Sequence, residues 1–176
     1  MINKDLLDKV IKCSDICKFE CIFDNISGVP IQYNEKYIMV SIYEDFQFDG
    51  FCIFNVKDIE NICYDETYEF INHICKEEKI YPSKAENINI ENYISIFNYF
   101  KNSEENIIVE CGGYDDEDYS FSIGKVEEVT EEYIKIKYFD YMAKWDENEL
   151  DSVYYEDISV VSFGKRYIKY MSKYTH

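Results

Sequence analysis

Cysteine is the residue of this chain with the most reactive side chain, and there are seven of them. Cys13, Cys17 and Cys21 recur every four residues, so a continuous helix would place three thiols on one face as a candidate metal site. Structural zinc sites use closer Cys pairs, together with His or a second pair, and no fourth ligand lies near in the sequence. Because a free cysteine behaves as a small buried hydrophobe, we predict that these three cysteines pack in the core.

Catalytic chemistry finds little support in the pattern of residues. A cysteine nucleophile needs a neighbouring imidazole or a positive field, and the two histidines, His73 and His176, do not lie beside a cysteine in a recognisable arrangement. Among 36 acidic residues, close carboxylate pairs must arise by chance, and nothing selects one pair for acid–base work. We therefore predict no catalytic residue, no cofactor and no enzymatic activity.

An acidic loop, Asp115 to Asp118, follows Gly112 and Gly113. Its carboxylates could hold calcium or magnesium through oxygen ligands, but they lack the alternating spacing of a calcium-binding loop. We predict a solvated hairpin turn and no metal site, and whether this loop or the cysteines bind an ion stays open. The two glycines lack the Lys and Ser/Thr of a phosphate-binding loop, so they indicate a turn.

Aromatic and acidic residues recur together after the central strand of each half of the chain. Exposed aromatic residues are good anchors for protein contacts, although an aromatic residue at the mouth of a barrel is as often a plug of the core. Asp beside a strand commonly caps a turn through its side chain, which favours a structural role over a duplicated ligand site. The candidate binding residues are Tyr43, Phe46, Phe48, Asp49, Tyr141, Trp145 and Asp146.

The elements that position these residues follow from an internal repeat. The stretch from Gly28 to Ile42 and the stretch from Gly124 to Tyr138 share a glycine, a Tyr-Ile pair nine residues later and a Glu two residues before that Tyr. Both are followed by an aromatic-Asp pair and then by an Asp-Ile pair, Asp58-Ile59 or Asp157-Ile158. Because a slip of one residue would turn a strand inside out, this matched alternation indicates a duplicated β module.

At these residues the chain resembles small, uncharacterised bacterial proteins with tandem β modules and, more loosely, Sm-like and SH3-like barrels. The recurring pattern is the glycine, the alternating strand, the aromatic-Asp pair and the Asp-Ile pair. The resemblance covers both modules, and it implies no activity, cofactor or catalytic residue.

The predicted fold class is α+β, with two related small β barrels of the Sm-like or SH3-like type joined by helices. An apolar stripe at steps of three and four predicts an N-terminal helix over 1–17. Period-two alternation, including a half-buried strand at 37–43, predicts the first barrel over 18–64. Linker helices follow over 65–104, and the second barrel with a basic C-terminal tail over 105–176.

The charge of the chain limits its partners. The 36 acidic and 18 basic residues give a formal net charge of −18, which repels phosphate backbones and disfavours direct nucleic-acid binding. A basic protein partner would be attracted. No apolar run of membrane-spanning length and no signal-peptide pattern occurs, and scattered cysteines suit a reducing compartment, so we expect a cytoplasmic protein.

Three functions are compatible with this sequence. The first is a non-enzymatic acidic protein-binding module, in one version an inhibitor or immunity-type protein that covers the basic cleft of a nucleic-acid enzyme. The alternative is a regulatory or scaffold protein that uses tandem barrels for peptide recognition or homo-oligomerisation. The third is an enzyme with an unrecognised site, which a deep pocket with convergent polar groups would favour.

Overall fold

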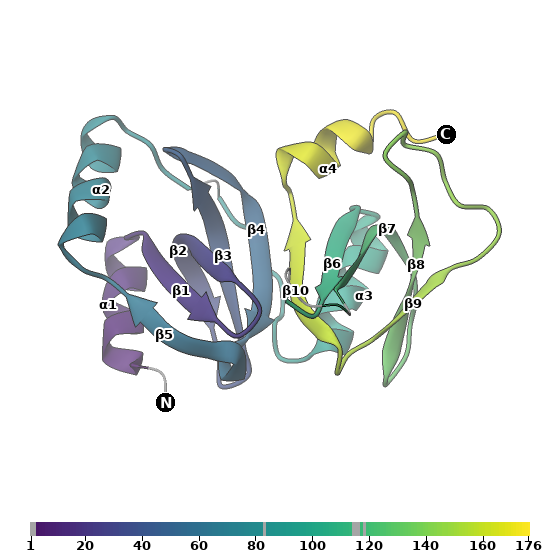
Figure 1. The fold of residues 1–176 in the computed structure, drawn as a ribbon, viewed down its shortest axis with the longest axis horizontal. Helices are drawn as coiled ribbons and strands as arrows, with labels where there is room; N and C mark the ends of the chain where they lie inside the picture. Colours follow the sequence, from purple (N-terminus) through teal and green to yellow (C-terminus); the bar gives the residue numbers. More distant parts are fainter. Residues whose placement is uncertain (1–2, 83, 114–116, 118) are drawn as a thin grey trace. The chain divides into compact units, whose positions relative to one another are not determined.

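The structure is a computed structural model, and it describes residues 3–82, 84–113, 117 and 119–176. The chain divides into two compact units, Met1–Glu86 and Asn87–His176 (Figure 1). Each unit consists of a helix, a set of antiparallel strands and a second helix, in that order along the chain.

The first unit begins with helix α1, Lys4–Cys13, which confirms an N-terminal helix. The Asn3 side chain caps it by accepting a hydrogen bond from the Leu6 amide at 3.0 Å. Leu7 and Val10 form its buried stripe. The helix ends at Ser14, whose φ of 52° lies in the left-handed region, so the apolar stripe stops short of Cys17.

The sheet of the first unit is antiparallel, with the strand order β5-β1-β2-β3-β4. A short 3₁₀ helix, Val56–Asp58, leads from β4 into β5. Helix α2, Glu66–Glu77, follows β5 and is capped by Asp65. The strands described in this unit are β1 Cys17–Cys21, β2 Asn25–Tyr33, β3 Tyr37–Glu44, β4 Gln47–Asn55 and β5 Ile59–Cys63.

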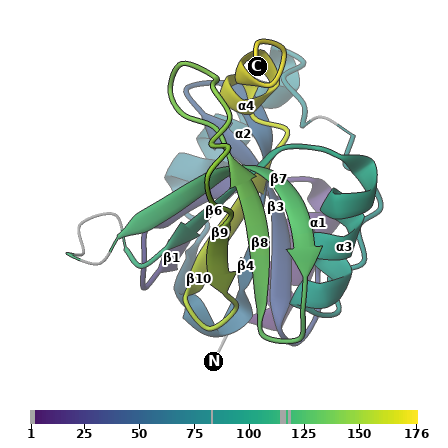
Figure 2. The ribbon, with the colours of Figure 1, turned by 90° about the vertical axis from the view of Figure 1, so that its right-hand side faces the viewer.

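The second unit repeats this arrangement. Helix α3, Tyr93–Ser103, packs against β7 (Figure 2), and helix α4, Arg166–Met171, follows the last strand. The strand order β10-β6-β7-β8-β9 matches that of the first unit, strand for strand. The strands described here are β6 Ile107–Cys111, β7 Ser120–Val129, β8 Tyr133–Tyr138, β9 Asp151–Tyr154 and β10 Ile158–Phe163.

The two glycines of the sequence repeat mark the same backbone contact in both units. Gly28 lies opposite Ile42, and Gly124 lies opposite Tyr138. A Cβ atom on Gly28 would lie 2.2 Å from the Ser41 carbonyl oxygen. A Cβ atom on Gly124 would lie 1.9 Å from the Lys137 carbonyl oxygen. Only glycine permits two strands to approach this closely.

A β-bulge follows each of these glycines at the same position. The register shifts between Pro30 and Gln32 in β2 and between Val126 and Glu128 in β7. Strand β2 lies in the interior of the strand order, and it accommodates Pro30 at its bulge. Each bulge changes the direction in which the side chain of its inserted residue points.

The turns before β3 and β8 are also built alike. The Asn34 side chain accepts hydrogen bonds from the amides of Lys36 and Tyr37, at 2.7 and 2.8 Å. In the second unit the Thr130 hydroxyl accepts from the Tyr133 amide at 3.0 Å. Asn and Thr are interchangeable here because both offer a side-chain oxygen to the backbone two or three residues later.

A polar contact at corresponding positions ties the second helix of each unit to the chain that enters the first strand. The buried amide of Asn72 in α2 both accepts from and donates to the backbone of Ile16, at 2.7 and 2.9 Å. In the second unit the asparagine lies before the first strand and not in the helix. Asn106 donates a hydrogen bond to the Ser172 hydroxyl at the end of α4, at 2.8 Å.

The closed Sm-like or SH3-like barrels predicted from the sequence are wrong. The ten strands of the described residues form open antiparallel sheet structure, and β5 and β4 lie at opposite ends of the strand order of their unit. The physical reason is visible in β3, where every residue from Tyr37 to Ser41 is buried. A small barrel buries one face of each strand, whereas here both faces are covered, so the half-buried strand predicted at this position is also wrong.

We predict that Gly28→Ala and Gly124→Ala each destabilise the protein by at least about 2 kcal/mol, because the added methyl group meets a backbone oxygen that cannot rotate away. Gly124→Ala should cost more, since its φ of +153° also disfavours an L side chain. Urea unfolding measures both, with Asn98→Ala on the exposed side of α3 as the control. A change within 0.5 kcal/mol of the control (roughly the range of surface substitutions) would contradict the prediction.

Candidate functional site

The three regularly spaced cysteines do not share a helix face. Cys17 and Cys21 lie in β1 and are buried, which confirms core packing for these two, whereas Cys13 at the end of α1 is exposed, so the prediction is wrong there. Burial raises the pKa of Cys17 and of Cys21 to about 12 and that of Cys111 to about 11. These thiols therefore stay protonated at neutral pH, which disfavours thiolate chemistry.

One buried acid in the first unit was not anticipated. Asp15 follows α1, its side chain is 6% exposed, and its carboxylate accepts from the Tyr64 hydroxyl at 2.7 Å and from Lys76 Nζ at 2.6 Å. Burial and the hydrogen bond to Asp15 raise the pKa of Tyr64, and the same carboxylate raises that of Lys76. The adjoining cavity holds about 50 Å³, far below the several hundred Å³ of small-molecule sites, so we interpret this cluster as a structural tie between α1 and α2.

The candidate binding residues of the first unit lie at the β3–β4 hairpin. Tyr43 and Phe48 face each other across the two strands, with rings 5.6 Å apart, and pack against the cluster beneath α2. Phe46 occupies the turn with a positive φ of 60° and is 43% exposed. Asp49 is half-buried in β4 and interacts with another residue. Of these residues, Phe46 alone carries an exposed aromatic ring.

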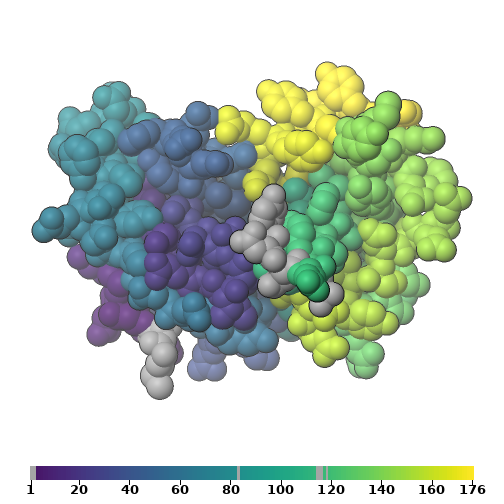
Figure 3. Space-filling model, in the orientation of Figure 1, coloured from purple at the N-terminus to yellow at the C-terminus, as the bar shows by residue number. Residues whose placement is uncertain are grey.

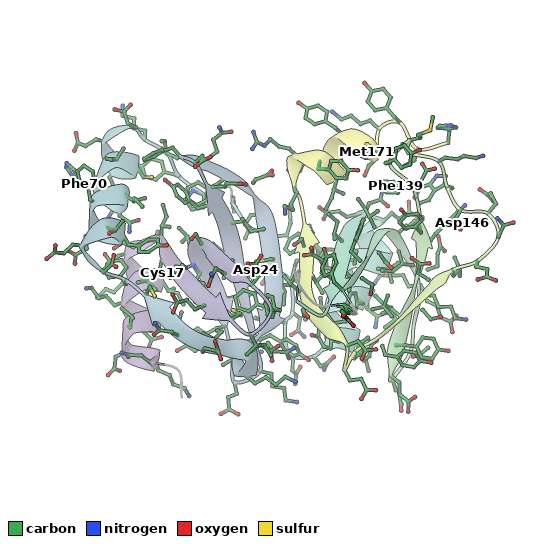
Figure 4. The ribbon with its side chains drawn as sticks, viewed as in Figure 1. Cys17, Asp24, Phe70, Phe139, Asp146 and Met171 are labelled. Atoms are coloured by element: carbon green, nitrogen blue, oxygen red, sulfur yellow. The ribbon has the colours of Figure 1, made fainter. Side chains whose placement is uncertain are left out.

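The candidate residues of the second unit lie in the long connection between β8 and β9. Tyr141 is 82% exposed. Trp145 is half-buried, pairs in a β-bridge with Phe139 and packs edge-on against its ring at 5.4 Å. Asp146 is exposed, and its carboxylate caps the backbone by accepting from the Asn148 amide at 2.8 Å. Figure 4 shows Asp146 on this outer loop, and Phe139 near Met171 of the α4 region.

The structure adds a surface feature beside Trp145, which we call the acidic hollow. It holds about 380 Å³. Four carboxylates and one ammonium group line it, which gives a formal charge of −3 at neutral pH. The lining residues are Glu127, Lys137, Asp146, Glu147, Asn148, Glu149 and Leu150.

Two features of the fold produce this hollow. Glu127 is the residue that the β7 bulge inserts, so its side chain leaves the alternation of the strand. In addition, β8 ends at Tyr138, and β9, the strand that pairs with it next, begins only at Asp151. The intervening loop therefore frames open space beside the sheet, and its atoms lie at the surface of the molecule (Figure 3).

Lys137 is the single cation of the acidic hollow. Its Nζ lies 3.4 Å from Glu147 Oε1 and 5.2 Å from the centre of the Trp145 ring. No ion pair joins Glu127 or Glu149 to another of the described residues. Both acids are exposed, so their carboxylates are available to a cationic group from outside.

Across residues 3–82, 84–113, 117 and 119–176, no three His, Cys, Asp or Glu residues are grouped so that they could hold a metal ion. The predicted turn at Asp115–Asp118 falls mostly outside the described residues, since Asp115, Asp116 and Asp118 are not described.

Comparisons of the chain with protein-family models, with curated proteins and with solved structures found no match. No helix in the described part of the chain is long and apolar enough to cross a membrane.

Sequence reasoning identified Trp145 and Asp146 but missed Glu127, Lys137 and Glu149. The structure does not bring the two candidate groups to matching positions either, because Phe48 lies in a paired strand and Trp145 in a loop. The missing signal was the bulge: a pattern of alternation does not show where an extra residue is inserted.

We predict that Asp15→Ala destabilises the protein by about 1–3 kcal/mol, because it leaves the Tyr64 hydroxyl without its acceptor in a partly buried site. Lys76→Met should cost less than Asp15→Ala, since the Lys76 side chain is 53% exposed and water can replace its ammonium group beside Asp15. Urea unfolding of both variants and of the double variant gives the coupling between them. Equal costs for the two single variants would contradict this assignment.

Alkaline stability follows from the buried thiols. The ordinary pKa of a thiol, 9.0, rises to about 12 at Cys17, so the folded state holds a proton that the unfolded state releases. The stabilisation is fully present below pH 9 and is lost as pH rises toward about 12. We predict that the free energy of unfolding falls over this range, and less steeply in Cys17→Ala, whereas Cys13→Ala serves as an exposed control. An unchanged slope in Cys17→Ala would contradict the prediction.

Proposed function

We propose that this protein is a non-enzymatic binding module that recognises a basic protein partner, and that an arginine or lysine side chain of the partner enters the acidic hollow. The observation that carries the proposal is the excess of carboxylates there: four acids face one lysine, and Glu127 and Glu149 form no ion pair within the described residues. A further cation would offset the remaining negative charge.

The chemistry of the acidic hollow favours a side chain over a metal ion. Its acids are too dispersed to meet at one point, but they can each accept hydrogen bonds from the several donors of a guanidinium group. Trp145 adds an aromatic surface that already attracts the ammonium group of Lys137, and arginine stacks on such rings. Arginine is therefore the favoured residue of the partner.

The net charge of −18 supports the same proposal at longer range. Opposite potentials speed the encounter of two proteins and weaken as salt rises. One form of this function is an inhibitor or immunity-type protein that covers the basic cleft of a nucleic-acid enzyme. A regulatory or scaffold protein that binds itself is the alternative, and it predicts a larger assembly without any basic partner.

The test is a titration with a short peptide of alternating arginine and valine, followed through the fluorescence of Trp145, the single tryptophan of the chain. We predict binding that weakens as salt rises, and an affinity about fivefold to twentyfold lower in the double variant Glu127→Gln/Glu149→Gln. The ring lies beside the acidic hollow, so its emission should change on binding.

The matched control is Glu77→Gln/Glu78→Gln at the end of α2, which removes the same charge from exposed positions of the first unit. It should bind as the unaltered protein does. Equal loss in both double variants would assign the binding to net charge alone, and no binding at low salt would overturn the proposal.

A further inference from the structure

Within the described part of the chain, strand β9 is an edge strand, and it begins beside the acidic hollow. It pairs with β8 on one side and stands last in the strand order of its unit (Figure 1). Leu150, which lines the acidic hollow, immediately precedes β9. An edge strand exposes backbone groups that can pair with another chain.

The register shows which backbone groups face outward. The Tyr155 amide donates to the Glu132 carbonyl at 3.0 Å, so residues at steps of two from Tyr155, namely Val153 and Asp151, direct their amides and carbonyls toward β8. Ser152 and Tyr154 must then direct theirs away from β8. In agreement, the Tyr154 carbonyl accepts from Asp157 in the following turn.

The side chains at this edge leave it accessible. Ser152 is exposed, Tyr154 is 48% exposed and Leu150 is 41% exposed. No lysine or proline occurs in β9 to block the pairing of a further strand.

We propose that the β9 edge pairs with an extended basic segment of the partner, which adds a strand through its backbone while one of its arginine or lysine side chains occupies the acidic hollow. This inference rests on the function proposed above and specifies how that partner binds. Backbone pairing supplies affinity, and pockets for alternate side chains supply specificity.

The occupant follows from the charge around the edge. The carboxylates of Glu127, Glu147 and Glu149 lie on the side of Leu150, and Asp157 ends the turn on the other side. An acidic or neutral strand would meet repulsion or gain little, whereas a basic strand is attracted along its whole length. Alternation in a strand places every second side chain on one face, so an alternating basic sequence fits this surface best.

The first experiment blocks the edge on the protein. Ser152→Pro removes an outward amide and adds a ring on the free side, while the pairing with β8 is kept because the Ser152 amide does not face β8. Ser152→Ala is the control, because it keeps the backbone intact. We expect Ser152→Pro to bind the arginine–valine peptide about tenfold more weakly, or worse, and Ser152→Ala to bind it unchanged.

The second experiment leaves the protein unaltered and methylates alternate backbone amides of the same peptide, which removes its donors and keeps its charge. Two versions, methylated on opposite edges, are compared. We expect one version to lose about tenfold in affinity and the other to lose less. This experiment uses the unaltered protein, so its result does not depend on whether Ser152→Pro folds. The Trp145 emission and the thermal midpoint of Ser152→Pro show whether that variant is folded.

The outcomes separate the two proposals. If Glu127→Gln/Glu149→Gln weakens binding but neither Ser152→Pro nor methylation does, edge pairing is overturned and the acidic hollow remains the site. If none of the changes weakens binding, both proposals fall. Self-association without peptide that Ser152→Pro abolishes would assign the edge to a second copy of the chain and overturn the basic partner.

Discussion

The close approach of two strands at a glycine is the constraint on which each unit depends. At Gly28 and at Gly124 the neighbouring strand brings a carbonyl oxygen to a place where a Cβ atom would have to lie. No other residue type fits there without moving the strand. The bulge that follows, with its inserted residue three positions after the glycine, then bends β2 or β7 and decides which side chain leaves the alternation. The order of the strands and their register are built around this pair of features.

The same frame carries different chemistry in the two units because the bulged residue differs. In the first unit it is Ile31, which packs against the apolar cluster beneath α2. In the second unit it is Glu127, which lines the acidic hollow. The residues whose carbonyl oxygens lie against the two glycines differ in the same way. In the first unit this residue is Ser41, which is buried. In the second unit it is Lys137, whose ammonium group lies near Glu147 and the Trp145 ring. A shared backbone thus supports an apolar core in one unit and a charged surface in the other.

The sequence predicted much of the local structure and little of the site. Apolar residues at steps of three and four located the N-terminal helix, and alternation located the strand at 37–43, which is β3. Alternation did not show that β3 is buried on both faces from Tyr37 to Ser41, and so it indicated barrels where the sheets are open. Trp145 and Asp146 were found because they recur as a pair, whereas Glu127 depends on a bulge, which composition and periodicity do not encode.

The length of the connection after the central strand decides what each unit presents to a partner. In the first unit, β3 and β4 stay paired up to the turn at Asp45 and Phe46, so the hairpin ends in a tight loop. In the second unit β8 ends at Tyr138 and β9 begins only at Asp151, and β9 is four residues long. The same loop carries most of the carboxylates of the acidic hollow. The residues withdrawn from the sheet therefore provide the charge, and the short strand that remains provides an edge with exposed backbone groups beside it.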